Sequence, residues 1–453
     1  MRAYIIIDLG FGDAGKGLLT DYLARENNAD LVVRYNGGAQ AAHNVVTPDG
    51  RHHTFAQFGS ATFISGVRTY LSRYVVIHPT ALLVEGTLLQ GKGITDAFQR
   101  LRISDQAFVI TPFHQAANRI REILRADARH GSCGVGVGET VADVILHGQE
   151  PVRAADLTQP NILRQKLQLI RQAKKTEMTA LLGDVSHDTR LAREFSIFEH
   201  EDVIETWIAS ISPIHEMGLV APDSLLSDWF QKTDTAIFEG AQGVLLDADH
   251  GFHPYTTWSN CTVDNALSLL NEHAPDAEVC KVGVLRAYAV RHGPGPLPTE
   301  STLLLPLIQE HNQQDDWQGS VRYGWFDAVL ARYALKLVGG VENLAITHMD
   351  LLPKLNQWRG CNGYQQWEGM HQTHIDLDIK GRVLQNFLPQ NHMSLEQRGA
   401  FTDVLMQVYP MMQSCSPSER EVLTSIGELL NRPVNLVSYG PTANDVYTSP
   451  TGK

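Results

Sequence analysis

The sequence has 453 residues, 43% hydrophobic and 19% charged, as in an ordinary globular protein, and a formal net charge of −13 that argues against a nucleic-acid-coating role. Its five cysteines are widely spaced without a CxxC pair, which predicts a reducing, cytoplasmic compartment with neither a disulfide framework nor a thiolate metal site. A signal peptide and an apolar run of about 18 residues are both absent from the sequence, so we expect no membrane association.

Short apolar runs that end in glycine-bearing loops recur along the chain. The first predicts a buried strand over residues 2–9. Further strands are expected within residues 29–38, 74–83, 107–114, 234–243, 279–291, 341–352 and 431–445. Helices are expected within residues 16–26, 115–131 and 325–340. Because strands alternate with helices, we expect an α/β fold with a largely parallel central sheet flanked by helices.

The chain shows no fixed-period repeat and no long linker. Residues from about 100 to 235 read as a mainly helical insert, and residues from about 355 to 425 as a peripheral part. We therefore predict that residues 1–453 form a single elaborated domain.

The stretch GFGDAGKG, residues 10–17, lies between the first strand and the first helix. Its glycines allow backbone N–H groups to approach phosphate oxygens, and Lys16 can neutralise a β- or γ-phosphate at the helix N-terminus. The pattern departs from a usual phosphate loop, because Gly17 replaces the expected hydroxyl residue and Asp13 adds an acid. Asp13 has two candidate roles, as a direct Mg²⁺ ligand or as a base toward a bound substrate; the alternative is a helix cap.

Three later stretches also carry polar groups at predicted strand ends. RYNGGAQAAHNVV places His43 in a small-residue loop, where it could act as a general acid. FEGAQGVLLDADHGFHPYTTWSN surrounds Gln242 with small residues that would let a planar ligand approach. AITHMD ends in Asp350, a carboxylate that could accept the two donors of a guanine.

Together these stretches resemble the adenylosuccinate synthetase family, and the resemblance spans most of the chain. The motifs that carry it are, in order, GDAGKG, VVRYNGGAQAAHNVV, FEGAQGVLLDADHG, PYTTWSN, GVLRAYAVRHGPGPLPTE, GWFDAVLARYA, THMD and VSYGP. It implies the P-loop-like GTP-binding architecture of that family, in a cytoplasmic homodimer that uses Mg²⁺. The implied reaction joins L-aspartate to IMP through a 6-phosphoryl-IMP intermediate, releasing GDP and phosphate, in AMP biosynthesis.

The resemblance also implies roles for single residues. Asp13 matches the family's base and Mg²⁺ ligand, His43 its catalytic acid and Lys16 its phosphate-binding lysine. The GTP contacts fall on Gly12, Gly15, Lys16, Gly17, Arg322, His348, Asp350, Ser438, Gly440 and Pro441. The IMP contacts fall on Asp13, Gln40, Cys133, His147, Gln242 and Thr257, and the metal contacts on Asp13 and Ala42.

Several family positions are altered in this chain. Cys133 replaces a phosphate-binding hydroxyl, His147 aligns with an arginine that the family lends across its dimer, and His348 replaces a lysine. The arginine-rich loop that holds aspartate keeps only Arg322. Three alternatives therefore stay open: the same chemistry on another purine nucleotide such as dGMP or with another amine donor, ATP as the phosphoryl donor, or a nucleotide-binding regulator without turnover.

Overall fold

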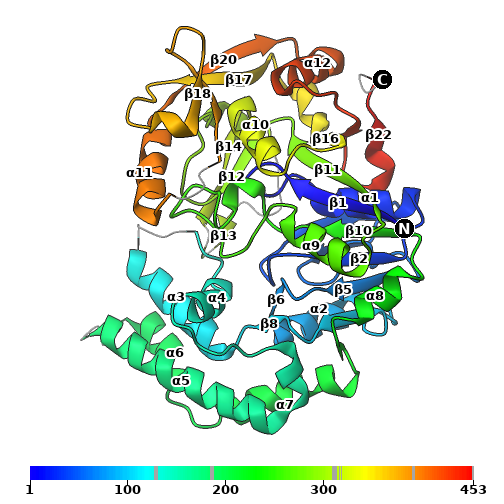
Figure 1. Cartoon of the computed structure of the whole chain (residues 1–453), viewed down its shortest axis with the longest axis vertical. Helices are drawn as coiled ribbons and strands as arrows, with labels where there is room; N and C mark the ends of the chain where they lie inside the picture. The colour runs from blue at the N-terminus through cyan, green and yellow to red at the C-terminus, as the bar shows by residue number, and fades with distance from the viewer. Residues whose placement is uncertain are drawn as a thin grey trace.

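The computed structural model describes residues 1–126, 131–183, 188–308, 314–315, 317, 319–389 and 393–450. A ten-stranded sheet runs through the molecule in the order β22-β21-β16-β11-β1-β10-β2-β5-β7-β9 (Figure 1). Its strands are β1 (Arg2–Asp8), β2 (Leu31–Arg34), β5 (Arg68–Leu71), β7 (Leu101–Ser104), β9 (Val220–Ala221), β10 (Thr235–Glu239), β11 (Glu278–Arg286), β16 (Asn343–Thr347), β21 (Leu436–Ser438) and β22 (Val446–Thr448). All neighbours pair in parallel except β21 and β22, so the expected largely parallel sheet is confirmed.

Strand β1 shows why this sheet is buried on both faces. Successive side chains of a strand point to opposite faces. Ile5 and Ile7 join one apolar cluster, whereas Ile6 joins the cluster on the other face together with Leu19 and Leu23 of the first helix. A near-continuous Ile run is what a parallel strand between two helical layers requires.

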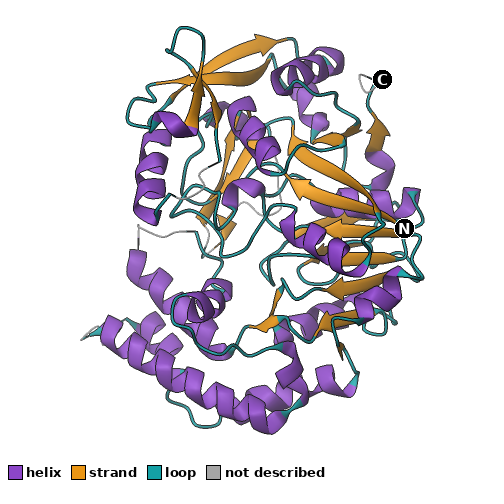
Figure 2. Ribbon diagram, in the orientation of Figure 1, coloured by secondary structure: helices purple, strands orange, loops and turns teal. Residues whose placement is uncertain are grey.

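Helices cover the sheet and extend from it (Figure 2). Those beside the sheet are α1 (Lys16–Glu26), α2 (Pro79–Gly91), α8 (Leu225–Phe230), α9 (Asp264–His273) and α10 (Ala328–Leu337). A helical group lies at the bottom of Figure 1 and comprises α3 (Pro112–Arg125), α4 (Val137–Ile145), α5 (Pro160–Leu182), α6 (Thr189–Ser196) and α7 (Val203–Glu216). No helix in the described ranges combines the length and apolar character needed to cross a bilayer.

A second sheet lies at the top of Figure 1. It contains β15 (Phe326–Asp327), β17 (Trp358–Gln365), β18 (Ile375–Leu377), β19 (Leu384–Phe387) and β20 (Tyr409–Cys415), beside α11 (Leu395–Leu405) and α12 (Glu419–Leu430). In a smaller three-stranded sheet, β14 (Gly319–Gly324) lies between β12 (Ala289–His292) and β13 (Gln314–Asp315). Two further sheets have two strands each: β3 (His43–Val46) pairs with β4 (His52–Phe55), and β6 (Val76–Ile77) pairs with β8 (Phe108–Val109). Short 3₁₀ helices follow two strands of the main sheet, at Val244–Leu246 and Met349–Lys354.

Two of the expected strands are largely wrong. Within residues 74–83 only Val76–Ile77 are extended, and within 107–114 only Phe108–Val109. In both segments a proline at the first helical position starts a helix, because its fixed φ suits the helix and its missing N–H is not needed there. Helix α3 accordingly begins at Pro112 rather than at residue 115. Its expected end at Gly131 directly follows residues 127–130, which lie outside the described ranges.

The loops after β1 and β10 pack directly on each other at the carboxyl edge of the main sheet. The Leu245 N–H donates to the Gly10 carbonyl at 3.1 Å. A Cβ at Gly243 would lie 2.1 Å from the Gly10 carbonyl oxygen and 2.4 Å from the Gly12 nitrogen, closer than atoms can approach. Glycine at position 243 therefore allows the loop after β10 to pack against the loop after β1.

We expect Gly243→Ala to lower the free energy of unfolding by about 2–3 kcal/mol, because backbone rather than a flexible side chain must move to admit the methyl group. Gly399→Ala on α11 is the matched control, since its Cβ would meet nothing within 4 Å. Removing a helical glycine there should stabilise by about 0.5–1 kcal/mol. Urea denaturation of both variants checks this, and equal effects of the two would contradict the packing argument.

Candidate active site

The loop of residues 10–17 follows β1 and leads into α1. Gly12 and Gly15 both have φ of +98°, and Asp13 has φ of +58°. These left-handed conformations turn the chain sharply between strand and helix, and glycine adopts them without strain. The loop thereby holds Asp13 and Lys16 at the start of α1, where the helix dipole favours an anion.

The buried carboxylate of Asp8 organises this loop from inside. It accepts the backbone N–H groups of Gly10 at 2.9 Å, Gly12 at 3.3 Å and Ala14 at 2.9 Å. The ammonium of Lys16, itself only 3% exposed, lies 2.9 Å from Oδ2 of the same carboxylate, the oxygen that also accepts from Ala14. A buried lysine is tolerable because this ion pair compensates its charge.

Asp13 forms an ion pair with His292, the last residue of β12. The Arg286 Nε donates to the Asp13 backbone carbonyl at 2.6 Å. Burial alone would raise the pKa of Asp13, but His292 and the positive charges of Arg286 and Lys16 outweigh it and hold the pKa well below its usual range. The loop therefore presents an ionised carboxylate that still has 37% of its surface exposed.

His43 lies against the start of α1, since a Cβ at Gly17 would come 3.0 Å from the His43 Cβ. Its Nδ1 lies 2.6 Å from a carboxylate oxygen of Glu239, the last residue of β10. Glu239 is fully buried and also accepts from the Ser60 backbone N–H at 3.0 Å and from the Ser60 hydroxyl. This pairing leaves Nε2 of His43 as the nitrogen available for proton exchange with a ligand.

Both members of the His43–Glu239 pair have shifted pKa values. Burial lowers the pKa of His43, with Arg34 and Lys16 acting in the same direction against Glu239. Burial raises the pKa of Glu239, but Arg34, His43 and Ser60 outweigh it and lower the value to about 2. Glu239 is thus held as a carboxylate that orients the imidazole.

The amides of Gln40 and Gln242 lie at opposite sides of the Gly37–Gly38 turn. A Cβ at Gly38 would be 2.8 Å from the Gln40 Oε1, and one at Gly37 would be 3.3 Å from the Gln242 Oε1. Gln40 Oε1 and Gln242 Nε2 are buried without a hydrogen-bond partner in the described part of the chain. Unpaired buried polar atoms are costly, which favours a polar ligand here.

Three residues expected to contact the guanine, His348, Asp350 and Ser438, lie on or just after the neighbouring strands β16 and β21. Thr347 ends β16 and donates from its hydroxyl to the Ala14 carbonyl at 2.8 Å, which joins this strand end to the loop. His348 follows with φ of +59°, and burial together with Arg286 lowers its pKa well below the usual range. Asp350 is exposed, and the Ser438 hydroxyl on β21 donates to the Gly440 carbonyl at 2.9 Å.

The other expected site residues take no part in the hydrogen bonds and ion pairs described above. His147 is exposed after α4, Cys133 lies in the segment before α4, and Ala42 is exposed. Arg322 pairs with Glu300 and donates to backbone carbonyls. The backbone N–H of Thr257 donates to the Leu246 carbonyl, and Pro441 is exposed after β21.

Asp8, His292, Glu239 and Ser60 were missed by sequence reasoning as site residues. Asp8 and Glu239 carried a usable signal, because each is an acid that ends an otherwise apolar strand at the edge where the other candidate groups gather. His292 and Ser60 carried none, since only folding brings them to Asp13 and Glu239.

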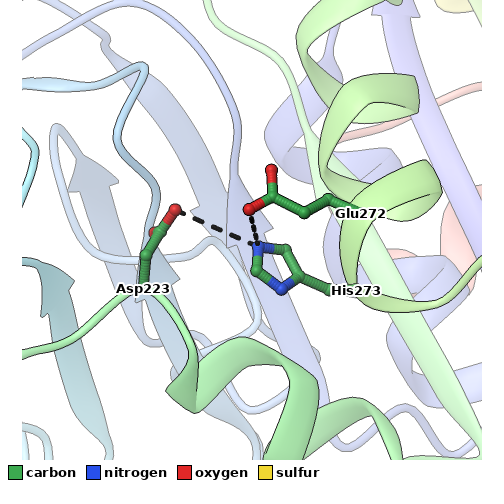
Figure 3. Close-up of side chains that lie close together, drawn as sticks. All are labelled: Asp223, Glu272 and His273. Atoms are coloured by element: carbon green, nitrogen blue, oxygen red, sulfur yellow. Dashed lines mark ion pairs between the residues drawn. The ribbon is translucent and has the colours of Figure 1, made fainter.

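Asp223, Glu272 and His273 lie close enough to hold a metal ion (Figure 3). Arg73 already donates to Asp223 at 2.8 Å and pairs with Glu272. A cation would have to displace this guanidinium from both carboxylates, so the cluster is best described as an ion-pair network.

The chain is similar to known proteins along most of its length. A family model described as adenylosuccinate synthetase matches residues 5–447. The adenylosuccinate synthetase of Mycobacterium leprae is 33% identical over 374 residues, covering 81% of each chain. That of Chlorobium chlorochromatii is 30% identical over 456 residues, covering 97% of this chain and 95% of the relative.

Two solved structures share the fold. The fully ligated adenylosuccinate synthetase of Plasmodium falciparum aligns with a TM-score of 0.75 at 19% identity, covering 99% of this chain and 100% of that one. The succinoaminodeoxyadenylate synthetase of cyanophage S-2L, bound to dGMP and to dATP as an energy donor, aligns with a TM-score of 0.57 at 18% identity, covering 99% and 96%.

The fold and the loop define a nucleotide-binding ligase of the α/β class. The chain belongs to the adenylosuccinate synthetase family. It is therefore an enzyme of purine biosynthesis that forms a bond at the expense of a nucleoside triphosphate.

The lowered pKa of Glu239 predicts a pH-dependent stability. A carboxyl whose pKa is lowered by folding stabilises the fold above its unfolded pKa, and this contribution is lost as the pH falls through the folded pKa. The ordinary value of 4.5 and the folded value of about 2 set the window. We expect Glu239→Gln to cost on the order of 2–3 kcal/mol of unfolding free energy at pH 7, and the deficit to shrink below pH 4.5.

Urea denaturation of wild type and variant at pH values from 7 to 3 measures this deficit. Glu278→Gln is the control, because Glu278 pairs with Arg2 on the surface and its side chain is 74% exposed. A Glu239→Gln deficit that stays constant across the range would refute the assigned charge state.

Proposed function

We propose that the protein is a GTP-dependent ligase that joins L-aspartate to IMP through a 6-phosphoryl-IMP intermediate, releasing GDP and phosphate. The observation that carries the proposal is the convergence of Asp13, Lys16 and His43 on one loop, with each side chain held by a partner on a different strand or loop. The adenylosuccinate synthetase of Plasmodium falciparum, whose structure is described as fully ligated, has the same fold.

In this proposal the Asp13 carboxylate takes the N1 proton of the purine, which makes the 6-oxygen nucleophilic. His292, Arg286 and Lys16 keep Asp13 ionised, so the base is ready at neutral pH. The oxygen attacks the γ-phosphorus of GTP, the bond to the β-phosphate oxygen breaks, and GDP leaves. Lys16 and the loop amides bear the charge of the phosphates.

In the second step the aspartate amine attacks C6 and the phosphate leaves with the C6–O bond electrons. His43, oriented by Glu239, is placed to donate a proton to a phosphate oxygen. The amide groups of Gln40 and Gln242 supply unpaired polar atoms for the purine nucleotide.

Mg²⁺ fits the partly exposed carboxylate of Asp13, because this cation prefers one or two carboxylates combined with phosphate oxygens. Ala42 could add only its backbone carbonyl, from an exposed segment. The ion would supply charge neutralisation at the transferred phosphoryl group. A homodimer and a cytoplasmic location complete the proposal.

A divergent substrate is the second candidate, and Arg322 favours it. Arg322 is expected near GTP and is the one arginine kept in the loop that resembles the family's aspartate-holding loop, and its guanidinium pairs with Glu300 and with the Gly293 and Gly295 carbonyls. A purine nucleotide such as dGMP, or another amine, would then replace one substrate. Because His348 replaces a lysine, ATP is also tested as the phosphoryl donor. A regulator without turnover would release no phosphate.

Phosphate release by the purified protein with Mg²⁺ and GTP tests these candidates. IMP and L-aspartate are added singly and together, and then dGMP, other amines and ATP. Release that requires both IMP and aspartate, with a product of adenylosuccinate mass, supports the main proposal. Release only with another purine or amine supports the second candidate, and no release with any combination supports a regulator.

We expect Asp13→Asn to lower kcat by about 10²–10⁴-fold, because the amide cannot accept the purine proton. Nucleotide affinity should change much less than kcat, since Lys16 and the loop amides remain. Asp21→Asn on α1 is the control, because Asp21 is a buried carboxylate paired with Arg25 on the same helix. Full activity of Asp13→Asn would remove Asp13 as the base.

A further inference from the structure

The donors that line the loop of residues 10–17 already hold an anion that belongs to the protein. Asp8 accepts the N–H groups of Gly10, Gly12 and Ala14 and the ammonium of Lys16, at 2.9–3.3 Å. Backbone N–H groups of a glycine-rich turn combined with a lysine are the set of donors that such loops use for phosphate. The Asp8 side chain is fully buried and that of Lys16 is 3% exposed, so water does not screen this pair.

A nucleotide phosphate that binds Lys16 therefore lies close to the negative charge of the Asp8 carboxylate. Lys16 has three N–H donors and can contact both groups, but the phosphate must lie near a buried carboxylate. Like charges at close range in a poorly solvated site repel strongly. Without a ligand, the same carboxylate compensates the buried ammonium and keeps the loop in shape.

We propose that Asp8 acts as an intramolecular substitute for a phosphate group, which occupies Lys16 in the empty enzyme and weakens nucleotide binding in proportion to phosphate charge. The proposal rests on the proposed function, in which this loop binds the phosphates of the donor nucleotide. Asp8 thus sets affinity and is a positioning residue for Lys16, with no direct part in the chemistry.

The test compares binding of GMP, GDP and a non-hydrolysable GTP analogue to the full-length wild type and to Asp8→Asn by calorimetry. Asparagine keeps the size and one oxygen acceptor of aspartate but removes the charge. We expect Asp8→Asn to bind the GTP analogue about tenfold tighter and GMP less than about threefold tighter, with GDP between them. Asp21→Asn again serves as control and should leave all three affinities unchanged.

A merely structural role would give a different pattern. Loss of loop shape would weaken all three ligands, or change them equally. The ratio of GTP-analogue to GMP affinity is therefore the deciding quantity, and an unchanged or smaller ratio in Asp8→Asn overturns the inference.

Asp8→Asn leaves Lys16 without its charge partner and could fail to fold alone. In that case Asp8→Asn and Asp8→Ser are refolded with and without the GTP analogue. Recovery that requires the analogue supports the inference, because the phosphates then replace Asp8 as the partner of Lys16. Failure of both variants in both conditions overturns it.

The wild-type measurement separates the two proposals. If the wild type binds neither the GTP analogue nor its ATP counterpart, the proposed function fails and this inference fails with it. If the wild type binds but Asp8→Asn binds no tighter, only the role of Asp8 is overturned.

Discussion

A lysine ammonium buried at the start of a helix must have an anion within hydrogen-bond distance, and the candidate active site is arranged around that requirement. Asp8 meets it in the described structure and at the same time satisfies three loop N–H groups. The left-handed glycines at 12 and 15 bring those N–H groups inward, and Gly243 lets the next loop support them from behind. A change in any of these residues would therefore alter the surroundings of the Lys16 ammonium.

The other charged groups of the site come in pairs whose partners set their protonation. His292 and nearby cations lower the pKa of Asp13, whereas burial and nearby cations lower the pKa of His43 against the opposing effect of Glu239. An ionised Asp13 can accept a proton, and the Glu239 carboxylate at Nδ1 favours the protonated form of His43, from which a proton can be donated. Glu239 ends a strand of the main sheet, whereas His292 ends β12 of a smaller sheet, so the packing of the two sheets sets the spacing of these pairs.

The family fold is retained although the contacts expected for the second substrate have changed. Arg322 is engaged by Glu300, and His147 lies exposed after α4. The groups proposed to serve phosphoryl transfer lie close together, whereas several positions proposed to recognise the substrates carry other residues than the family pattern predicts. Such a division is physically reasonable, because transfer chemistry depends on a fixed charge arrangement while recognition depends on groups around its rim.

Much of this architecture could be predicted from the sequence. Apolar runs predicted β1, β10 and β16, the first two followed by glycine-bearing loops, and the spacing around Lys16 predicted α1 at its observed bounds. The segment 74–83 was misjudged because its apolar composition suits a strand equally well, and only the proline decided for a helix.

The sequence by itself determined the order of the elements, the phosphate loop and the family, because these depend on local periodicity and on short motifs. The pairing of Asp13 with His292, of His43 with Glu239 and of Lys16 with Asp8 was decided by the tertiary structure. The first two join residues that are 279 and 196 positions apart, and the third depends on a loop conformation that the neighbouring strands impose. Ion pairs between residues at the ends of different strands produce no periodic pattern in a sequence, since the register of several parallel strands must be set before those side chains meet.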